Sequence, residues 1–213
     1  MSWLDGDTTA GPGDPSSGRR PPTRARLIRA FMTLVQQRGY AAVGTAEILA
    51  AAAAPRGSLY HHFPDGKSGL AVAAVEELTD DITGALQQAA VSKRSLGALL
   101  KQMASARAAW LKQTGWSEGP LLGVLTNETV PHEPDIAAAL ALASEAVTGA
   151  FTNLFIARGF PPDVARRHAQ LARATLDGAM TLSRAARSSE SLVEAGAFLA
   201  RHLATPDSIG DTP

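Results

Sequence analysis

The chain contains no cysteine, and this absence excludes several kinds of chemistry. Its 213 residues offer no thiol for a disulfide, for nucleophilic catalysis, or for a cysteine-ligated zinc or iron–sulfur site. Aromatic residues are also scarce, at 5% of the chain, whereas alanine is abundant and hydrophobic residues make up 45%. Small side chains let helices approach one another closely, so this composition favours helix-on-helix packing. We therefore expect an all-α protein.

Long hydrophobic runs are absent as well. No run of eighteen apolar residues occurs, so the sequence predicts no membrane span. Residues 1–22 lack the basic start and apolar centre of a signal peptide, and they are rich in Gly, Pro, Ser, Thr and Asp. We expect disordered tails over 1–22 and 206–213, with Arg19 and Arg20 able to reach a DNA backbone. The chain is expected to be cytoplasmic and to make no membrane contact.

The chain has no net charge, but its charges are unevenly distributed. Residues 1–18 hold three Asp and no base, residues 19–67 hold eight Lys or Arg against two acids, and the remaining 146 residues sum to −3. The positive charge is therefore confined to 19–67, which carries +6. Nucleic-acid binding requires a positive field near the phosphates, although small helical domains without that function also vary by a few charges.

The stretch 39–70, GYAAVGTAEILAAAAAPRGSLYHHFPDGKSGL, has the spacing of two short helices joined by a tight turn. Ile48 and Leu49 belong to the first helix, residues 52–55 form the bend, and a second helix covers 56–63. Such a pair is the helix-turn-helix of DNA-binding proteins, in which the second helix enters the major groove.

The second helix of this pair has one face that can pack and one that can contact a ligand. Leu59 and Phe63 stand four residues apart and share the inward face. The remaining residues offer cationic, hydroxyl and imidazole groups for phosphates and base edges, and a glycine for close backbone approach. These residues are Arg56, Gly57, Ser58, Tyr60, His61 and His62.

The segment 54–63, APRGSLYHHF, followed by Lys67, resembles the tetracycline-repressor (TetR) family of one-component regulators. In that family a first helix, a Gly-Tyr pair such as Gly39-Tyr40 and a [ST]-[LI]-Y-x-H-F signature occur in this order. The sequence of this segment, APRGSLYHHFPDGK, is most similar to the subgroup of lincomycin- and multidrug-resistance repressors. The resemblance extends over 23–75 and implies a DNA-binding domain over 23–68. It also implies a homodimer that reads a palindromic operator in double-stranded DNA.

The resemblance assigns roles to individual residues. Gly57 and Tyr60 match the positions that contact bases. The positions on the phosphate side are matched by Thr45, Arg56, Ser58, His61, His62 and Lys67. Two residues depart from the pattern. Ala53 stands where the turn commonly has glycine and needs a negative φ or strain of about 1 kcal/mol, and Gly44 replaces a Ser or Thr cap, which shifts the expected helix cap to Thr45.

Helical periodicity continues through the rest of the chain. Thr23 is expected to cap a first helix over 24–38, which Gly39 ends. Beyond the helix-turn-helix, the sequence predicts helices over 67–90, 96–113, 121–130, 134–158, 162–186 and 191–203. Nine helices result, in agreement with the family. We expect a three-helix N-terminal domain followed by a helical effector-binding and dimerisation domain over 69–205.

Two sets of residues are candidates for the functions of this second domain. Bulky apolar walls with sparse polar groups suit a small hydrophobic effector, and the candidate lining is Met103, Trp110, Leu121, Leu122, Asn127, Phe151, Phe155, Thr175, Asp177 and Met180. Apolar stripes on the last two helices dock on a second copy in the family, and the candidate interface is Ala179, Leu182, Leu192, Gly196, Leu199 and Leu203. The alternative for both sets is ordinary packing within the chain's own core.

Catalytic motifs are missing from the sequence. Adjacent His61 and His62 point about 100° apart on a helix and do not form a paired ligand set, while His168 on an apolar face is expected to be a satisfied core histidine or a pocket donor. No nucleophile elbow, P-loop or dinucleotide fingerprint occurs. We expect no enzyme, cofactor or metal. The function expected is a ligand-responsive repressor, and the alternative is a helical small-molecule-binding or scaffold protein with a vestigial helix-turn-helix.

Overall fold

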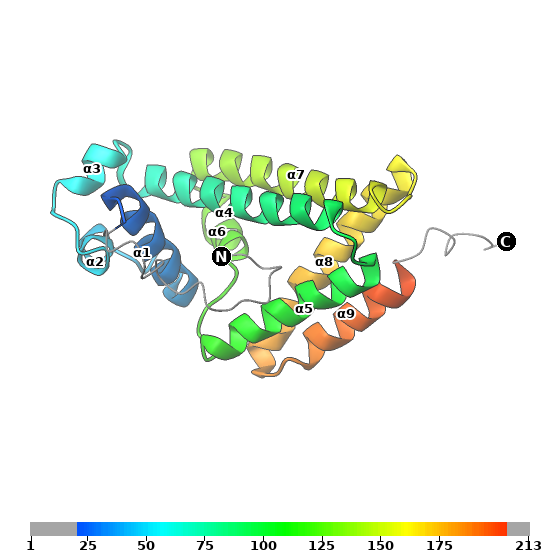
Figure 1. Cartoon of the computed structure of the whole chain (residues 1–213). Helices are drawn as coiled ribbons and strands as arrows, with labels where there is room; N and C mark the ends of the chain where they lie inside the picture. Colours follow the sequence, from blue (N-terminus) through cyan, green and yellow to red (C-terminus); the bar gives the residue numbers. More distant parts are fainter. Residues whose placement is uncertain (1–20, 204–213) are drawn as a thin grey trace. The chain divides into compact units, whose positions relative to one another are not determined.

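The computed structural model describes residues 21–203, and its regular elements in that range are all α-helices. The all-α expectation is confirmed. Nine helices follow one another (Figure 1): α1 Thr23–Arg38, α2 Thr45–Ala51, α3 Ser58–His62, α4 Gly66–Val91, α5 Leu96–Gln113, α6 Leu121–Thr129, α7 Pro134–Ile156, α8 Pro162–Ala186 and α9 Glu190–His202. The predicted tails, with Arg19 and Arg20, lie outside the described residues except for 21 and 22.

Local sequence signals account for most helix ends. α5 and α8 begin and end at the predicted residues, and the Ser95 hydroxyl caps α5 by accepting a hydrogen bond from the Ala98 amide at 3.3 Å. α3 begins two residues later than predicted, because 55–58 form a turn in which the Ser58 amide donates to the Pro55 carbonyl at 3.0 Å. The expectation that Thr45 caps α2 is wrong. Gly44 occupies the cap position without a side-chain hydrogen bond, and Thr45 is the first helical residue. The expectation that Thr23 caps α1 is wrong in the same way, because Pro22 occupies that cap position and Thr23 is the first helical residue.

The described chain folds into two compact units that do not follow the predicted boundary at 68/69. The first unit holds 21–80 together with 117–144, and the second holds 81–116 together with 145–203. α4 and α7 each contribute residues to both units. The difference arises because α6 and the start of α7 complete the core around the helix-turn-helix.

The core of the first unit explains why two such short helices are stable. α2 has 7 residues and α3 has 5, lengths at which an isolated helix is marginal in water. Apolar side chains from α1, α2, α3, α4, α6 and α7 form one buried cluster, which includes Phe31, Ile48, Leu59, Leu70, Leu125 and Ile136. The helix-turn-helix is thus held by packing against longer helices rather than by its own propensity.

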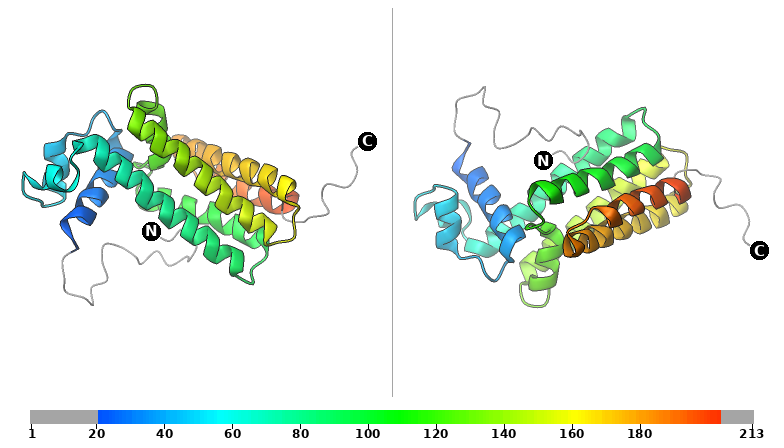
Figure 2. Two further views of the ribbon diagram at one scale, coloured as in Figure 1. Left: turned by 90° about the horizontal axis from the view of Figure 1, so that it is seen from above. Right: turned by 90° about the horizontal axis from the view of Figure 1, so that it is seen from below.

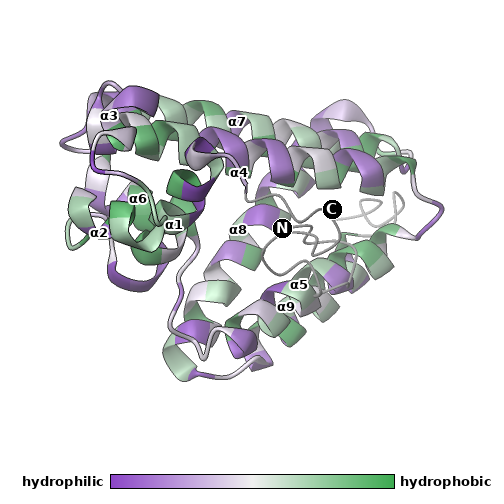
Figure 3. Ribbon diagram, turned by 60° about the vertical axis from the view of Figure 1, so that its left-hand side comes forward, coloured by the Kyte–Doolittle hydropathy of each residue, from purple (hydrophilic) through white to green (hydrophobic). Residues whose placement is uncertain are grey.

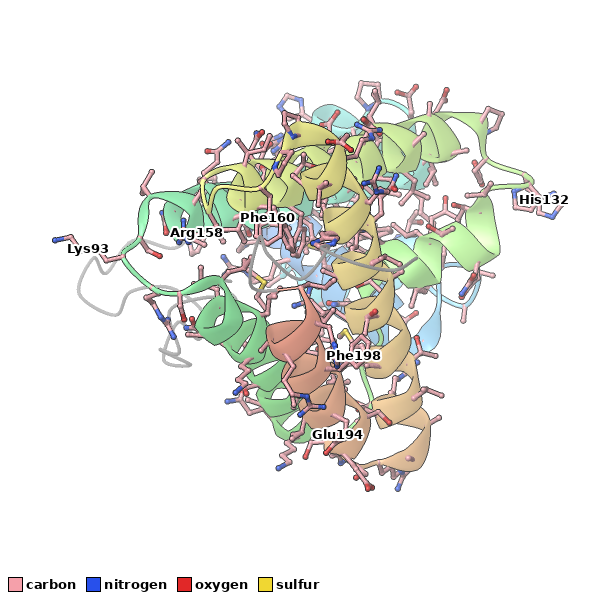
Figure 4. All side chains as sticks on the ribbon, turned by 90° about the vertical axis from the view of Figure 1, so that its right-hand side faces the viewer. Lys93, His132, Arg158, Phe160, Glu194 and Phe198 are labelled. Atoms are coloured by element: carbon pink, nitrogen blue, oxygen red, sulfur yellow. The ribbon has the colours of Figure 1, made fainter. Side chains whose placement is uncertain are left out.

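The core of the second unit is built on α5, α8 and α9, which run side by side (Figures 1 and 2). Gly196 allows α9 to approach α5 closely, because a Cβ at this position would lie 2.7 Å from the Cβ of Ala104. Arg158 closes the end of α4 by donating to the carbonyls of Ala89, Ala90 and Ser92 at 2.7–3.1 Å. Arg158 and Phe160 lie at the same end of this unit (Figure 4).

α7 is the most apolar helix of the described chain. By length and composition alone, it is long and apolar enough to cross a membrane. Its buried residues instead supply both cores, with Ile136 and Leu140 in the first and Phe151 and Leu154 in the second. Buried and exposed positions recur along α7, as in a helix with one buried and one exposed face, and Figure 3 colours the helices of both units by hydropathy.

Candidate nucleic-acid interface

The turn between α2 and α3 contains a strained residue. Ala53 has φ 46°, a left-handed conformation that favours glycine. The Ala54 amide donates to the Leu49 carbonyl at 2.9 Å, which closes the turn. Arg26 of α1 fixes the same turn from outside, since its Nε donates to the Ala52 carbonyl at 2.9 Å and its Nη2 to the Ala53 carbonyl at 3.3 Å. The sequence allowed Ala53 either a negative φ or a strained backbone, and the structure has the strained backbone.

α3 has the two faces that the sequence predicts. Leu59 is fully buried and Phe63 is 4% exposed, whereas Tyr60 is 62% exposed. Nothing lies within 4 Å of where a Cβ would stand on Gly57, so the backbone at the start of α3 is open to an approaching ligand. Arg56 and His61 are exposed, and Thr45, Ser58 and His62 are partly exposed. The exposed side of α3 therefore combines an aromatic ring, an open backbone and groups that can contact phosphate.

Further aromatic and cationic groups gather beside α3. The rings of His61 and His62 meet edge to face with centroids 4.9 Å apart, closer than their sequence positions suggested. The guanidinium of Arg24 lies 5.5 Å from the centroid of Phe63, which adds a positive charge from α1. Arg24 and Arg26 were not among the residues predicted from the sequence, although their position at the start of the first basic helix was an available signal. Over 21–203, no group of three His, Cys, Asp or Glu could hold a metal ion.

Lys67 is engaged by its own chain. Its ammonium donates to the carbonyl of Tyr40 at 2.6 Å and lies 3.9 Å from the centroid of the Tyr40 ring. Burial lowers the pKa of Lys67, and the nearby charges of Glu133 and Glu128 oppose that shift. The ammonium therefore stabilises the 39–44 loop between α1 and α2. Only its remaining N–H groups are available for a contact with phosphate.

Two acidic residues of the 117–144 segment hold the same loop. Burial, with the charge and hydrogen bond of Glu133, raises the pKa of Tyr40 to about 12. The Glu128 carboxylate accepts from the Ala41 amide at 3.0 Å, and a Cβ on Gly39 would overlap it. Gly39 also has φ 87°, so glycine is required here on both counts. Periodicity could not reveal these contacts, because they join residues more than 80 positions apart.

The predicted effector residues fall into different parts of the structure. Leu121 is buried in the core of the first unit, Leu122 packs against that core, and Asn127 is exposed. In the second unit, Met103, Phe151 and Phe155 share one core, while Trp110 and Met180 share another. Thr175 is partly exposed and Asp177 is exposed. The ten residues do not form one cluster within either unit, and Leu121 and Phe155 pack in the cores of different units.

The predicted dimer residues divide into buried and exposed ones. Leu192 and Leu199 are fully buried in their own chain, and Ala179, Gly196 and Leu203 are buried too, so these five are core residues and not surface contacts. Leu182 is the exception, at 62% exposed. The other exposed apolar residues of α8 and α9 are Leu171, Val193 and Phe198. The helices carry apolar residues on two sides, and the sequence could not show which side faces α5.

His168 is a core residue, as one of its two predicted roles required, but it is not fully satisfied. It is 8% exposed, and its ring lies 5.8 Å from the Phe155 ring and 5.3 Å from the Phe160 ring, between centroids. Its Nδ1 has no hydrogen-bond partner among the described residues. Burial lowers the pKa of His168, and the charge of Arg167 lowers it further. A neutral imidazole in an aromatic environment serves packing here.

Comparison with known proteins agrees with a helix-turn-helix in the N-terminal part of the chain and a helical C-terminal part. Residues 27–74 match the family model of bacterial regulatory proteins of the tetR family, and residues 97–198 match that of the LmrA/YxaF-like transcriptional regulator C-terminal domain. The protein named "Uncharacterized HTH-type transcriptional regulator Rv0196" of Mycobacterium tuberculosis is 30% identical over 169 residues, which cover 77% of this chain and 85% of the relative. LmrA of Bacillus subtilis, an HTH-type transcriptional regulator, is 26% identical over 175 residues, 80% of this chain and 91% of its own.

Solved structures of the same kind share the fold. The regulatory protein TetR from Rhodobacter sphaeroides has a TM-score of 0.75 at 25% identity, with 84% of this chain and 98% of that chain covered. A TetR transcriptional regulator from Legionella pneumophila has a TM-score of 0.74 at 18% identity, with 86% and 98% covered. The relatives are regulators and not enzymes. The chain is a DNA-binding transcriptional regulator of the TetR family, with a C-terminal part of the LmrA/YxaF-like kind.

Proposed function

We propose that this regulator is a repressor that binds a palindromic operator as a homodimer, with α3 as its recognition helix. The observation that carries the proposal is the exposed Tyr60 beside the unobstructed backbone of Gly57, on a helix whose other face is locked into the core. An exposed ring can contact base edges, and an open backbone lets the helix enter the groove. Arg56, Ser58, His61, His62 and Thr45 are then assigned to phosphates, which set the register of the helix but carry no sequence information.

The homodimer is proposed because the recognition helix α3 is short. One short helix covers too few base pairs for useful specificity, so two copies related by a two-fold axis would read half-sites about 34 Å apart. The surface that suits a second copy is the outer face of α8 and α9, defined by Leu171, Leu182, Val193 and Phe198. Phe198 lies between the two helices in the view of Figure 4. Gly178 has open space where a Cβ would stand, which permits close approach on the same face.

A small molecule bound by the second unit is proposed to control DNA binding in the cytoplasm. A ligand that binds more tightly to a conformer with poor operator geometry lowers operator affinity by the ratio of its two affinities. α4 contributes residues to both units, so a change at its 81–91 part can be transmitted to the helix-turn-helix in the first unit.

Binding to DNA tests the proposal. Fluorescence anisotropy with a duplex from upstream of the protein's own gene, compared with a shuffled duplex of the same length, should show preference for the former by about 10³-fold or more. Sedimentation of the complex should give two protein chains per operator. Equal binding to both duplexes would favour the vestigial helix-turn-helix instead.

A further inference from the structure

The 39–44 loop connects two residues that match phosphate-side positions of the family. Thr45, the first residue of α2, follows the loop directly. Lys67 holds the loop from the start of α4, through its 2.6 Å hydrogen bond to the Tyr40 carbonyl. That carbonyl also accepts from the Val43 amide at 3.3 Å, which closes a turn within the loop. The positions of Thr45 and Lys67 therefore both depend on the conformation of this loop.

Side chains of α6 and α1 hold the loop in this conformation. Glu128 of α6 accepts a hydrogen bond from the Ala41 amide through its Oε2 at 3.0 Å, and its Oε1 fills the place where a Cβ of Gly39 would stand. Arg38 of α1 donates from its Nη2 to the Ala42 carbonyl at 2.9 Å. The carboxylate of Glu128 thus lies directly against the loop backbone, and both belong to the first unit.

The charge of Glu128 is unfavourable for DNA binding. A carboxylate close to groups that contact phosphate repels the negatively charged DNA backbone. The charge of Glu128 also favours the protonated form of Lys67, against the burial that lowers the pKa of that lysine, so it acts close to a phosphate-side residue. If Glu128 acted only through its charge, it would weaken DNA binding. Any benefit to DNA binding must therefore come from its hydrogen bond.

We propose that Glu128 is a positioning residue for DNA binding, because its hydrogen bond from the Ala41 amide holds the 39–44 loop where Thr45 and Lys67 can meet phosphates. This inference rests on the interface proposed above and adds to it a residue from outside the segment 23–68. Phosphate contacts carry no sequence information, so loss of the hydrogen bond lowers the affinity for every duplex by a similar factor. Base recognition by α3 is left unchanged.

Two substitutions separate the reach of Glu128 from its charge. Glu128→Gln keeps an acceptor oxygen at the same reach without the charge, whereas Glu128→Asp keeps the charge on a side chain that is one methylene shorter. Fluorescence anisotropy at several salt concentrations measures the affinity of each variant for the operator duplex and for the shuffled duplex. Glu128→Asp should bind both duplexes about tenfold more weakly, with a salt slope flatter by about one unit, while Glu128→Gln should stay within about threefold of the wild type.

A control pair and a second readout show whether the loop is responsible. Glu76→Gln and Glu76→Asp make the same changes at an exposed position of α4 and should leave both affinities within about twofold of the wild type. Hydrogen exchange followed by mass spectrometry should be faster over 39–44 in Glu128→Asp and unchanged in Glu128→Gln. Unchanged loop exchange in a Glu128→Asp protein that binds DNA weakly would overturn the proposal.

The affinities give two further outcomes that would overturn the role of Glu128. These are wild-type affinity in Glu128→Asp, and a change of more than about threefold in either direction in Glu128→Gln. The second outcome decides the matter even if Glu128→Asp does not fold. Equal binding of the two duplexes by the wild type would instead reject operator reading. The effect of Glu128→Asp would still be measurable in that case, because it is expected on any sequence.

Discussion

At the scale of single residues, the helix-turn-helix depends on backbone conformations that its sequence only partly accommodates. Ala53 adopts φ 46°, where an L-residue with a Cβ is strained by about 1–2 kcal/mol. Gly39 meets the same requirement with the residue that has no such cost. The turn is nevertheless held, because the Arg26 guanidinium donates hydrogen bonds to the carbonyls of Ala52 and Ala53.

Replacing Ala53 with glycine should therefore stabilise the protein. Relief of strain outweighs the larger entropy of glycine in the unfolded chain, for a net gain of about 0.5 kcal/mol. Urea denaturation followed by circular dichroism measures the change. Ala50→Gly, at an exposed position of the preceding helix α2, is the control and should destabilise by about 1 kcal/mol. An Ala53→Gly variant less stable than the wild type would contradict the strained turn.

The Tyr40 hydroxyl gives a second residue-scale prediction. The chain has two tyrosines, so Tyr60→Phe leaves Tyr40 as the only phenol, and its titration by ultraviolet absorbance should have a midpoint near the raised pKa of about 12. Because folding favours the neutral phenol, this group's contribution to stability is complete below pH 10 and is lost as the pH rises toward 12. Glu133→Gln removes the negative charge and should lower the midpoint only part of the way toward 10, because burial is the larger cause of the raised pKa. A midpoint near 10 in the parent variant would contradict both the burial of the phenol and its contact with Glu133.

At the scale of helices, the periodicity of the sequence predicted well which helices form and where they begin and end. Caps and breakers such as Ser95 and Gly39 are local, and the helices bounded by them lie where the sequence placed them, with α5 and α8 matching at both ends. The site was predictable to the same extent, since the inward Leu59 and outward Tyr60 follow from a 3.6-residue period. Contacts between residues distant in sequence were not predictable. Examples are the side of α9 that packs against α5 and the hydrogen bond from the Ala41 amide to Glu128.

Substitutions of two leucines on α8 and α9 should have different effects, because Leu182 is exposed and Leu199 is buried. Leu182→Glu places a charge on the exposed outer face and should give folded monomers, whereas Leu199→Ala leaves a cavity in the chain's own core and should cost about 2–5 kcal/mol. Sedimentation measures the assembly state, and chemical denaturation measures stability. Leu142→Glu, on α7 and 74% exposed, is the control and should remain dimeric. A dimeric Leu182→Glu protein would reject this interface.

At the scale of the whole molecule, the division of the chain is itself informative. The unit that carries the helix-turn-helix also contains α6 and the start of α7, so the 39–44 loop is tied to residues that a purely N-terminal domain would not include. Both α4 and α7 continue into the second unit. These shared helices connect the two units covalently, and the effector response proposed above would act through them.

The central claim is that α3 reads DNA, and one titration tests it most directly. Operator binding by wild type and Tyr60→Ala is compared by fluorescence anisotropy at fixed salt, with His132→Ala as a control at an exposed position outside α3. Tyr60 is 62% exposed, so its removal should leave thermal stability unchanged while lowering specific affinity by about 1–3 kcal/mol. Affinity for shuffled DNA should change little. A Tyr60→Ala protein that binds its operator as tightly as the wild type would contradict the assignment of α3 as the recognition helix.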